Sequence, residues 1–192
     1  KKSSIYILQG LTKLRQLANH PCLIDDYPDS DSGKFSEVKR TIETLMNEKN
    51  KVLIFSSFVK HLNLFASYFN EIGLKYSMLT GETTNREETV NNFQNNEDVR
   101  IFLISIKAGG VGLNLVAADY VFILDPWWNP AVENQAISRA HRIGQKNKVF
   151  VYRFISENTI EEKIRILQTK KSSLADTFIN SENNLDLSIE TI

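Results

Sequence analysis

Two arginines and a glutamine recur at helical spacing in the segment QAISRAHRIGQ, which runs from Gln135 to Gln145. Gln135, Arg139 and Arg142 stand at positions i, i+4 and i+7, so a continuous helix would place their side chains on one face. Guanidinium groups match phosphate oxygens, and an arginine directed at a transferring γ-phosphoryl group accelerates the transfer by about 10³–10⁵. The alternative is a solvated basic face with Glu133 as an ion-pair partner. Spacing by itself leaves both interpretations open.

A glycine-rich segment, IKAGGVGLNL, follows the apolar run RIFLIS. Gly109, Gly110 and Gly112 would let the backbone approach a phosphate or ribose closely, and Lys107 adds a positive charge there. A plain glycine turn is the alternative. The segment lacks the GxxxxGK[ST] spacing of a P-loop, and no other segment supplies the Walker-type Lys-Ser/Thr pair that holds phosphates and Mg²⁺. We therefore expect that this chain does not hydrolyse ATP alone.

Two adjacent tryptophans, Trp127 and Trp128, lie between prolines in the segment DPWWNP. Neighbouring tryptophans in a loop cannot both face one core. We expect one to be buried and the other to be free to stack on a base or sugar, a contact worth about 1–3 kcal/mol in single-strand binders. Trp128 is our candidate for the stacking residue.

Helical and apolar segments alternate along the chain. The runs KVLIFSSF, RIFLIS, YVFILD and KVFVYRFI are continuous enough for strands buried on both faces of a sheet. Strands that alternate with helices of about 10–15 residues imply βαβ crossovers, so we expect an α/β fold with three layers, in which helices cover both faces of a parallel sheet. In such sheets, ligands bind outside the carboxyl ends of the strands. Besides these strands, the expected elements are a strand at 75–79 and helices at 5–17, 34–48, 59–71, 85–95, from about 131, and near the C-terminus.

Turn-forming residues divide the chain into three predicted parts. The acidic stretch DDYPDSDSG favours an exposed linker, and the final NSENNLDLSIETI is polar enough to fray. We predict an N-terminal helix and linker at 1–33, the α/β lobe at 34–158, and a C-terminal helix and tail at 159–192.

The composition is that of an ordinary folded domain. Hydrophobic residues make up 42% and charged residues 24%, which argues against a disordered or membrane-embedded chain. Basic and acidic residues number 23 each, so any attraction to nucleic acid must come from local groups. The apolar runs are far shorter than the ~20 residues that span a bilayer, which predicts an intracellular protein without a membrane partner. Cys22 is the only cysteine, which excludes an internal disulfide and a Cys-rich zinc site.

Four separated segments resemble, in order and spacing, the second motor lobe of SWI/SNF-type DNA-dependent ATPases. They are VLIFSSF, LTGETTNREETVNNF, the stretch from ISIKAGG to HRIGQ, and VFVYRFISENTIEEKI, which together cover nearly everything from 51 to 164. The earlier LTKLRQLANHPCLI resembles the segment just ahead of that lobe. In this family two RecA-like lobes close around ATP, and the first supplies the P-loop and the magnesium-binding acid. The resemblance implies a RecA-like helicase C-terminal lobe that works with ATP and Mg²⁺, held mainly by a first lobe of the same parent protein.

The resemblance also assigns site residues by position. It implies that Arg139 and Arg142 reach the phosphates, that Gln135 heads the same motif, and that Gly110 and Gly112 lie in the loop between nucleotide and DNA. Contacts of hydroxyls, backbone N–H groups and lysines with phosphates carry no sequence information, so movement on DNA is expected to be independent of sequence. The residues implied to meet the backbone of double-stranded DNA are Ser56, Ser57, Thr80, Gly81, Ser105 and Lys107, with Arg86 as a weaker candidate.

Two positions depart from the family pattern: Ser138 stands where an Asp commonly precedes the first arginine, and Lys107 stands where Thr-Arg or Leu-Lys variants occur. Neither removes a motif arginine. We expect the second motor lobe of an ATP-driven double-stranded DNA translocase that remodels protein–DNA complexes. The alternatives are a non-catalytic RecA-like module that binds DNA or a protein, and a lobe of a strand-separating helicase. The location would be cytoplasmic, at the nucleoid, in a prokaryote and nuclear in a eukaryote.

Overall fold

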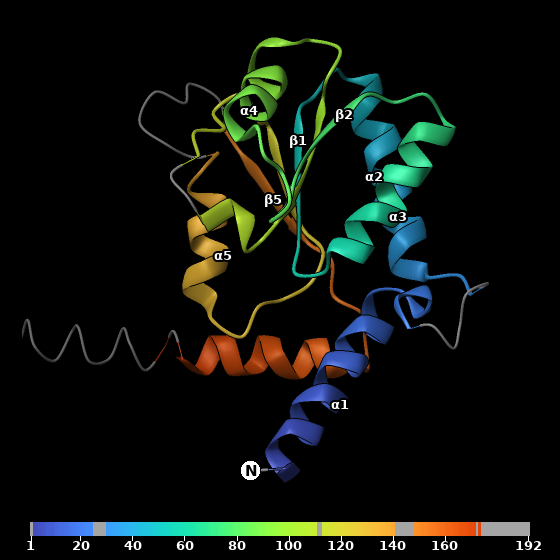
Figure 1. Ribbon diagram of the computed structural model, residues 1–192, viewed down its shortest axis with the longest axis vertical. Helices are drawn as coiled ribbons and strands as arrows, with labels where there is room; N and C mark the ends of the chain where they lie inside the picture. The colour runs from blue at the N-terminus through green and yellow to red at the C-terminus, as the bar shows by residue number, and fades with distance from the viewer. Residues whose placement is uncertain (1, 25–29, 111–112, 141–147, 172, 174–192) are drawn as a thin grey trace, which may run out of the picture.

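A parallel sheet of five strands, in the order β2-β3-β1-β4-β5, forms the centre of the molecule (Figure 1). The computed structural model describes residues 2–24, 30–110, 113–140, 148–171 and 173. Helices cover both faces of the sheet, which confirms the predicted three-layer α/β class. The strands are β1 (Val52–Ser56), β2 (Tyr76–Leu79), β3 (Ile101–Ser105), β4 (Tyr120–Ile123) and β5 (Phe150–Arg153).

The central strands are apolar at nearly every position because both of their faces are covered. In β1, Leu53 and Phe55 point into one core, while Val52 and Ile54 point into the other. Successive side chains of a strand alternate between faces, so a strand in the middle of a three-layer fold needs a continuous apolar run. This is why KVLIFSSF and RIFLIS do not show the alternation of a half-exposed strand.

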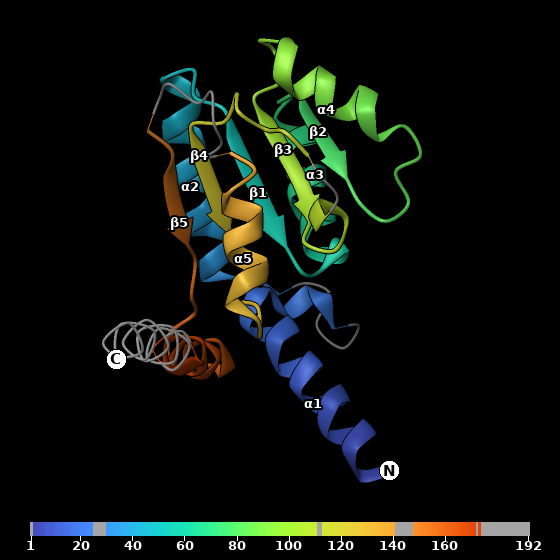
Figure 2. The ribbon, with the colours of Figure 1, turned by 90° about the vertical axis from the view of Figure 1, so that its left-hand side faces the viewer.

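Helices pack on both faces of the sheet, as Figures 1 and 2 show. Helices α2 (Gly33–Asn47) and α3 (Val59–Glu71) contribute to one core, and α4 (Arg86–Asn95) and α5 (Pro130–Ile137) contribute to the other. The Ser32 side chain caps α2 by accepting from the Phe35 N–H, and the Asn129 side chain caps α5 by accepting from the Ala131 N–H. The remaining elements are α1 (Lys2–Asn19), the short 3₁₀ helices η1 (Pro21–Leu23) and η2 (Ala108–Gly110), and a helix over 160–171.

Helix α1 extends away from the sheet, and much of its apolar side is exposed (Figure 2). The helix itself was expected from the spacing of its leucines. Ile5, Leu8 and Leu14 are nevertheless more than half exposed. Only the end of the helix nearest the sheet is buried, at Arg15 and Asn19. None of the described helices combines the length and apolar character needed to cross a lipid bilayer.

Helix α5 is shorter than the sequence predicted. It ends at Ile137, and residues 138–140 form a turn. The N–H of Arg139 donates to the carbonyl of Ala136 and the N–H of Ala140 to that of Ile137, so the bonds here join residues three apart, as in a tightened 3₁₀ turn. The prediction of one continuous helical face from Gln135 through Arg139 is therefore wrong, and Arg142 lies outside the described residues.

A histidine of α3, His61, is fully buried beside Phe65, with ring centroids 5.2 Å apart. Within the described part of the chain, neither of its ring nitrogens has a hydrogen-bond partner. Burial lowers the pKa of His61 from 6.5 to about 3, and the positive charges of Lys34 and His20 act in the same direction. The fold therefore holds this imidazole in its neutral form.

We expect His61→Leu to remove a pH-dependent part of the stability. The folded pKa lies below the unfolded value, so the unfolded chain takes up the proton first, and the wild type loses stability as pH falls from about 6.5 toward about 3. Between about pH 7.5 and about pH 5 the loss from this one group is about 2 kcal/mol. Urea unfolding of both proteins at the two pH values measures it. Equal losses in wild type and variant would contradict this account of His61.

Candidate functional site at the carboxyl ends of the strands

Polar side chains gather where four neighbouring strands end. Ser56 ends β1 and Ser105 ends β3, while Thr80 directly follows β2 and Asp125 comes two residues after β4. The strands are parallel, so these residues meet at one edge of the sheet, where α/β folds place their ligands. All four are buried.

The centre of this cluster is the carboxylate of Asp125, which is fully buried. Its Oδ1 accepts a hydrogen bond from Ser56 Oγ at 2.7 Å and from the Ser57 N–H at 3.0 Å. Its Oδ2 accepts from Arg15 Nη2 at 3.0 Å, which makes a buried ion pair. The same guanidinium donates to Ser57 Oγ at 3.1 Å and to the carbonyl of Pro126. Helix α1 and the turns after β1 and β4 are thus joined through one carboxylate.

Two aromatic rings flank the Arg15 guanidinium. Its Cζ lies 5.0 Å from the centroid of Phe58 and 5.4 Å from that of Trp127. A guanidinium stacks readily on aromatic faces, so the buried charge is paired by Asp125 and also covered by the rings. Trp127 packs against the core, and Trp128 beside it is half-buried.

A second buried ion pair continues this network toward the C-terminal helix. Lys34 Nζ donates to Glu161 Oε2 at 2.6 Å, to the carbonyl of Leu124 and to Asn19 Oδ1. Burial is the largest influence on both charged groups: it lowers the pKa of Lys34 and raises that of Glu161, while each partner acts in the opposite direction. Asn19 also donates to the carbonyl of Arg15, so the two ion pairs belong to one network.

The predicted DNA contacts differ in how much surface they offer. Ser56 has no exposed surface, and its hydroxyl is engaged by Asp125. Ser105 and Thr80 are also buried, and each holds its own turn, since Ser105 Oγ accepts from the Ala108 N–H and Thr80 Oγ1 from the Glu82 N–H. The predicted contacts with exposed or half-buried side chains are Gly81, Lys107, Ser57 and Trp128.

The glycine-rich loop and α5 lie against each other. Helix η2 contacts α5, and the N–H of Leu115, after the loop, donates to the carbonyl of Arg139 at 3.0 Å. A Cβ at Gly109 would lie 3.3 Å from side-chain atoms of both Phe55 and Ile104, so this glycine is needed for close packing. Gly110 is the last residue of η2, and Gly112 lies outside the described residues.

Two members of the predicted arginine motif, Gln135 and Arg139, fall within the described residues. Gln135 is exposed in the last turn of α5, and Arg139 is half-buried in the turn that follows. Guanidinium and amide N–H groups can donate hydrogen bonds to phosphate oxygens. The described residues hold no cluster of His, Cys, Asp or Glu able to bind a metal ion.

Sequence reasoning did not find the residues that organise this edge. From the sequence, Asp125 was noted only as the start of DPWWNP, and its burial became visible only in the structure. For Arg15, the sequence signal was a charged residue among the leucines of α1, which could have indicated a buried ion pair. Glu133, considered as the partner of a solvated basic face, is instead buried and paired with Arg153.

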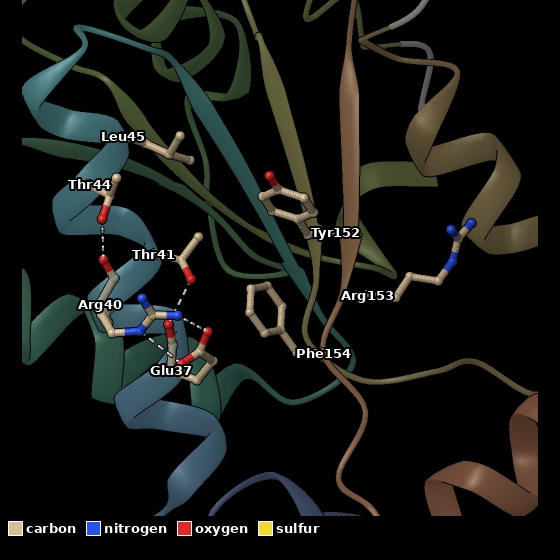
Figure 3. Close-up of a pocket in the computed structure, with 8 residues that line it drawn as sticks. All are labelled: Glu37, Arg40, Thr41, Thr44, Leu45, Tyr152, Arg153 and Phe154. Atoms are coloured by element: carbon tan, nitrogen blue, oxygen red, sulfur yellow. Dashed lines mark hydrogen bonds and ion pairs between the residues drawn. The ribbon is translucent and has the colours of Figure 1, made fainter.

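A separate cavity of about 410 Å³ opens between α2 and β5 (Figure 3). It is lined by Leu45, Tyr152 and Phe154 together with polar residues of α2. The charged groups of α2 at this cavity, Glu37 and Arg40, form an ion pair with each other at 2.6 Å. None of the site residues predicted from the sequence lines it.

The sequence pattern of the family described as "Helicase conserved C-terminal domain" matches residues 33–144. This range holds α2 to α5, four of the five strands and the whole strand-end cluster except Arg15. The chain belongs to this family. The helicase lobe is of the SWI/SNF type, since a human relative and a solved structure, both described below, carry that name.

Two curated relatives illustrate the similarity. An uncharacterised ATP-dependent helicase of Schizosaccharomyces pombe is 42% identical over 161 residues, which cover 82% of this chain and 16% of the relative. The human "SWI/SNF-related matrix-associated actin-dependent regulator of chromatin subfamily A member 1" is 38% identical over 178 residues, covering 85% of this chain and 17% of the relative. The helicase lobe thus spans about a sixth of the length of these relatives.

Two solved structures share the fold of the helicase lobe. The SWI2/SNF2 ATPase core domain of Sulfolobus solfataricus superposes with a TM-score of 0.74 at 35% identity, covering 90% of this chain and 36% of that one. The C-terminal part of the Fun30 ATPase domain superposes with a TM-score of 0.69, also at 35% identity, covering 82% of this chain and 54% of that one. The RecA-like lobe expected from the sequence is confirmed.

Proposed function

We propose that this lobe is the second half of a double-stranded DNA translocase driven by ATP, which remodels protein–DNA complexes. The observation that carries the proposal is the position of Arg139. Arg139 follows α5, and its backbone carbonyl accepts from the N–H of Leu115, so the residue is joined to the segment after the glycine-rich loop. A first lobe that holds ATP and Mg²⁺ on its P-loop would receive this arginine from across the cleft, in the way that an arginine finger acts in trans.

The DNA-facing part of the proposal rests on the same edge. Lys107 and Gly81 are exposed there, and Ser57 and Trp128 are half-buried. One lysine, a hydroxyl and backbone N–H groups suit phosphate contacts without base recognition. Ser56, Thr80 and Ser105 would shape the turns that carry these contacts, because their own hydroxyls are buried. Arg142 and Gly112 remain part of the proposed site on the resemblance alone.

Triplex displacement measured beside duplex unwinding tests the output of the motor. We expect the intact two-lobe protein to clear a third strand from DNA at the expense of ATP, without separating the duplex. The isolated 192-residue chain is the control and should show no ATP turnover with DNA and Mg²⁺. Unwinding of the duplex would favour the strand-separating helicase, and DNA binding without turnover in the intact protein would favour the binding module. Turnover by the isolated chain would contradict the division of the site between two lobes.

A further inference from the structure

A third buried carboxylate, Glu133, holds the start of α5. It lies inside this helix and is only 2% exposed. Its Oε1 accepts from the backbone N–H of Trp127 at 2.9 Å and from Nε2 of Gln168, and its Oε2 accepts from Nε of Arg153 at 3.3 Å. Three donors from the DPWWNP loop, β5 and the helix over 160–171 therefore meet on one side chain of α5, the helix that precedes Arg139.

The partners of Glu133 are themselves fixed. Gln168 also donates to the carbonyl of Trp127, and its Oε1 accepts from Arg165 Nη1 at 3.0 Å. Arg153 lines the cavity beside α2, but its side chain points away from Arg40, as Figure 3 shows, and its Nε donates to Glu133. The donors that surround the carboxylate thus come from elements that the sheet and the C-terminal helix hold in place.

We propose that Glu133 and Gln168 form a clamp that sets the position of Arg139 for phosphoryl transfer, and that the C-terminal helix acts on the ATPase site through this clamp. The proposal rests on the function proposed above. Arg139 lies six residues after Glu133, in the turn that directly follows α5. A small rotation of a helix of eight residues, Pro130–Ile137, would move the guanidinium at its end, and a misplacement of about 1 Å can cost about 10²-fold in rate.

Glu133 acts through Arg139 in this scheme, so it is a positioning residue. A glutamine at 133 would offer one acceptor oxygen and one amide donor in place of two carboxylate oxygens, so at least one of the three donors would face an N–H group. Gln168→Met keeps the length of the side chain and removes both of its hydrogen bonds to the loop and to α5.

The test is DNA-stimulated ATP turnover by the intact two-lobe protein carrying Glu133→Gln, Gln168→Met or Arg139→Ala. We expect Glu133→Gln and Gln168→Met to lower kcat about tenfold, with KM for ATP and the DNA concentration for half-activation within twofold of wild type. Lys163→Gln, an exposed change on the same C-terminal helix, is the matched control and should leave kcat unchanged.

A double-mutant cycle separates positioning from general damage. If Glu133 works through Arg139, adding Glu133→Gln to Arg139→Ala should lower kcat by less than twofold more. A tenfold further loss of kcat in the double variant would overturn the clamp but not the proposed function. Wild-type kcat in both Glu133→Gln and Gln168→Met, with Arg139→Ala impaired, would do the same. Wild-type turnover in Arg139→Ala would overturn the proposed function and the clamp together. If Glu133→Gln does not fold, the same measurements on Gln168→Met test the clamp.

Discussion

Arg139→Ala in the intact two-lobe protein is expected to lower DNA-stimulated ATP turnover by about 10³-fold while nucleotide affinity changes by only a few-fold. The reason is that the first lobe would hold the nucleotide, whereas the guanidinium would meet the γ-phosphoryl group only as charge develops during transfer. Steady-state turnover with saturating DNA gives kcat, and titration with a fluorescent ADP analogue gives the affinity. Arg142→Ala is expected to behave in the same way.

Two further variants define the role of the Arg139 side chain. Arg139→Lys keeps the positive charge but loses the planar pair of donors, so we expect it to restore only a small part of the lost rate. Arg40→Ala is the matched control, because Arg40 is an exposed arginine of α2 that pairs with Glu37. Wild-type turnover in Arg139→Ala, or an equal loss in Arg40→Ala, would refute the assignment.

Asp125→Ala is expected to destabilise the fold by about 3–5 kcal/mol, because it leaves the buried Arg15 guanidinium without its counter-charge. It also removes the acceptor of Ser56 Oγ and of the Ser57 N–H. Urea unfolding of the chain at neutral pH, followed by circular dichroism, measures the free energy of unfolding. Asp125→Asn, which keeps the shape but loses the charge, should fall between wild type and Asp125→Ala.

The control for Asp125 is the exposed ion pair of Lys75 and Asp98. Its atoms are 2.7 Å apart, but both side chains are about two-thirds exposed. Solvent screens such a pair, so Asp98→Ala should leave the unfolding midpoint nearly unchanged. Similar midpoints for Asp125→Ala and Asp98→Ala would show that the buried cluster does not hold α1 to the strand ends.

The fold was predicted from local patterns of apolar and polar residues along the chain. Strands β1 and β3 were recognised from their continuous apolar runs, and α2, α3 and α4 from polar-apolar spacing, because periodicity is set by neighbours along the chain. The ends of elements were less predictable: α5 stops at Ile137, although the spacing of its polar residues continues to Arg142. The closing of a helix into a 3₁₀ turn depends on contacts such as the one between Leu115 and the Arg139 carbonyl.

The QAISRAHRIGQ and glycine-rich segments, the parallel α/β class and the likeness to SWI/SNF lobes were thus present in the sequence itself. Only the tertiary structure showed that Ser56 donates a hydrogen bond to Asp125 and that Gln168 donates one to Glu133. The partners in these pairs are 69 and 35 residues apart, and Arg15 and Asp125 are separated by 110. A spacing pattern describes one element at a time, whereas the partner of a buried charge is chosen by which elements the sheet brings together.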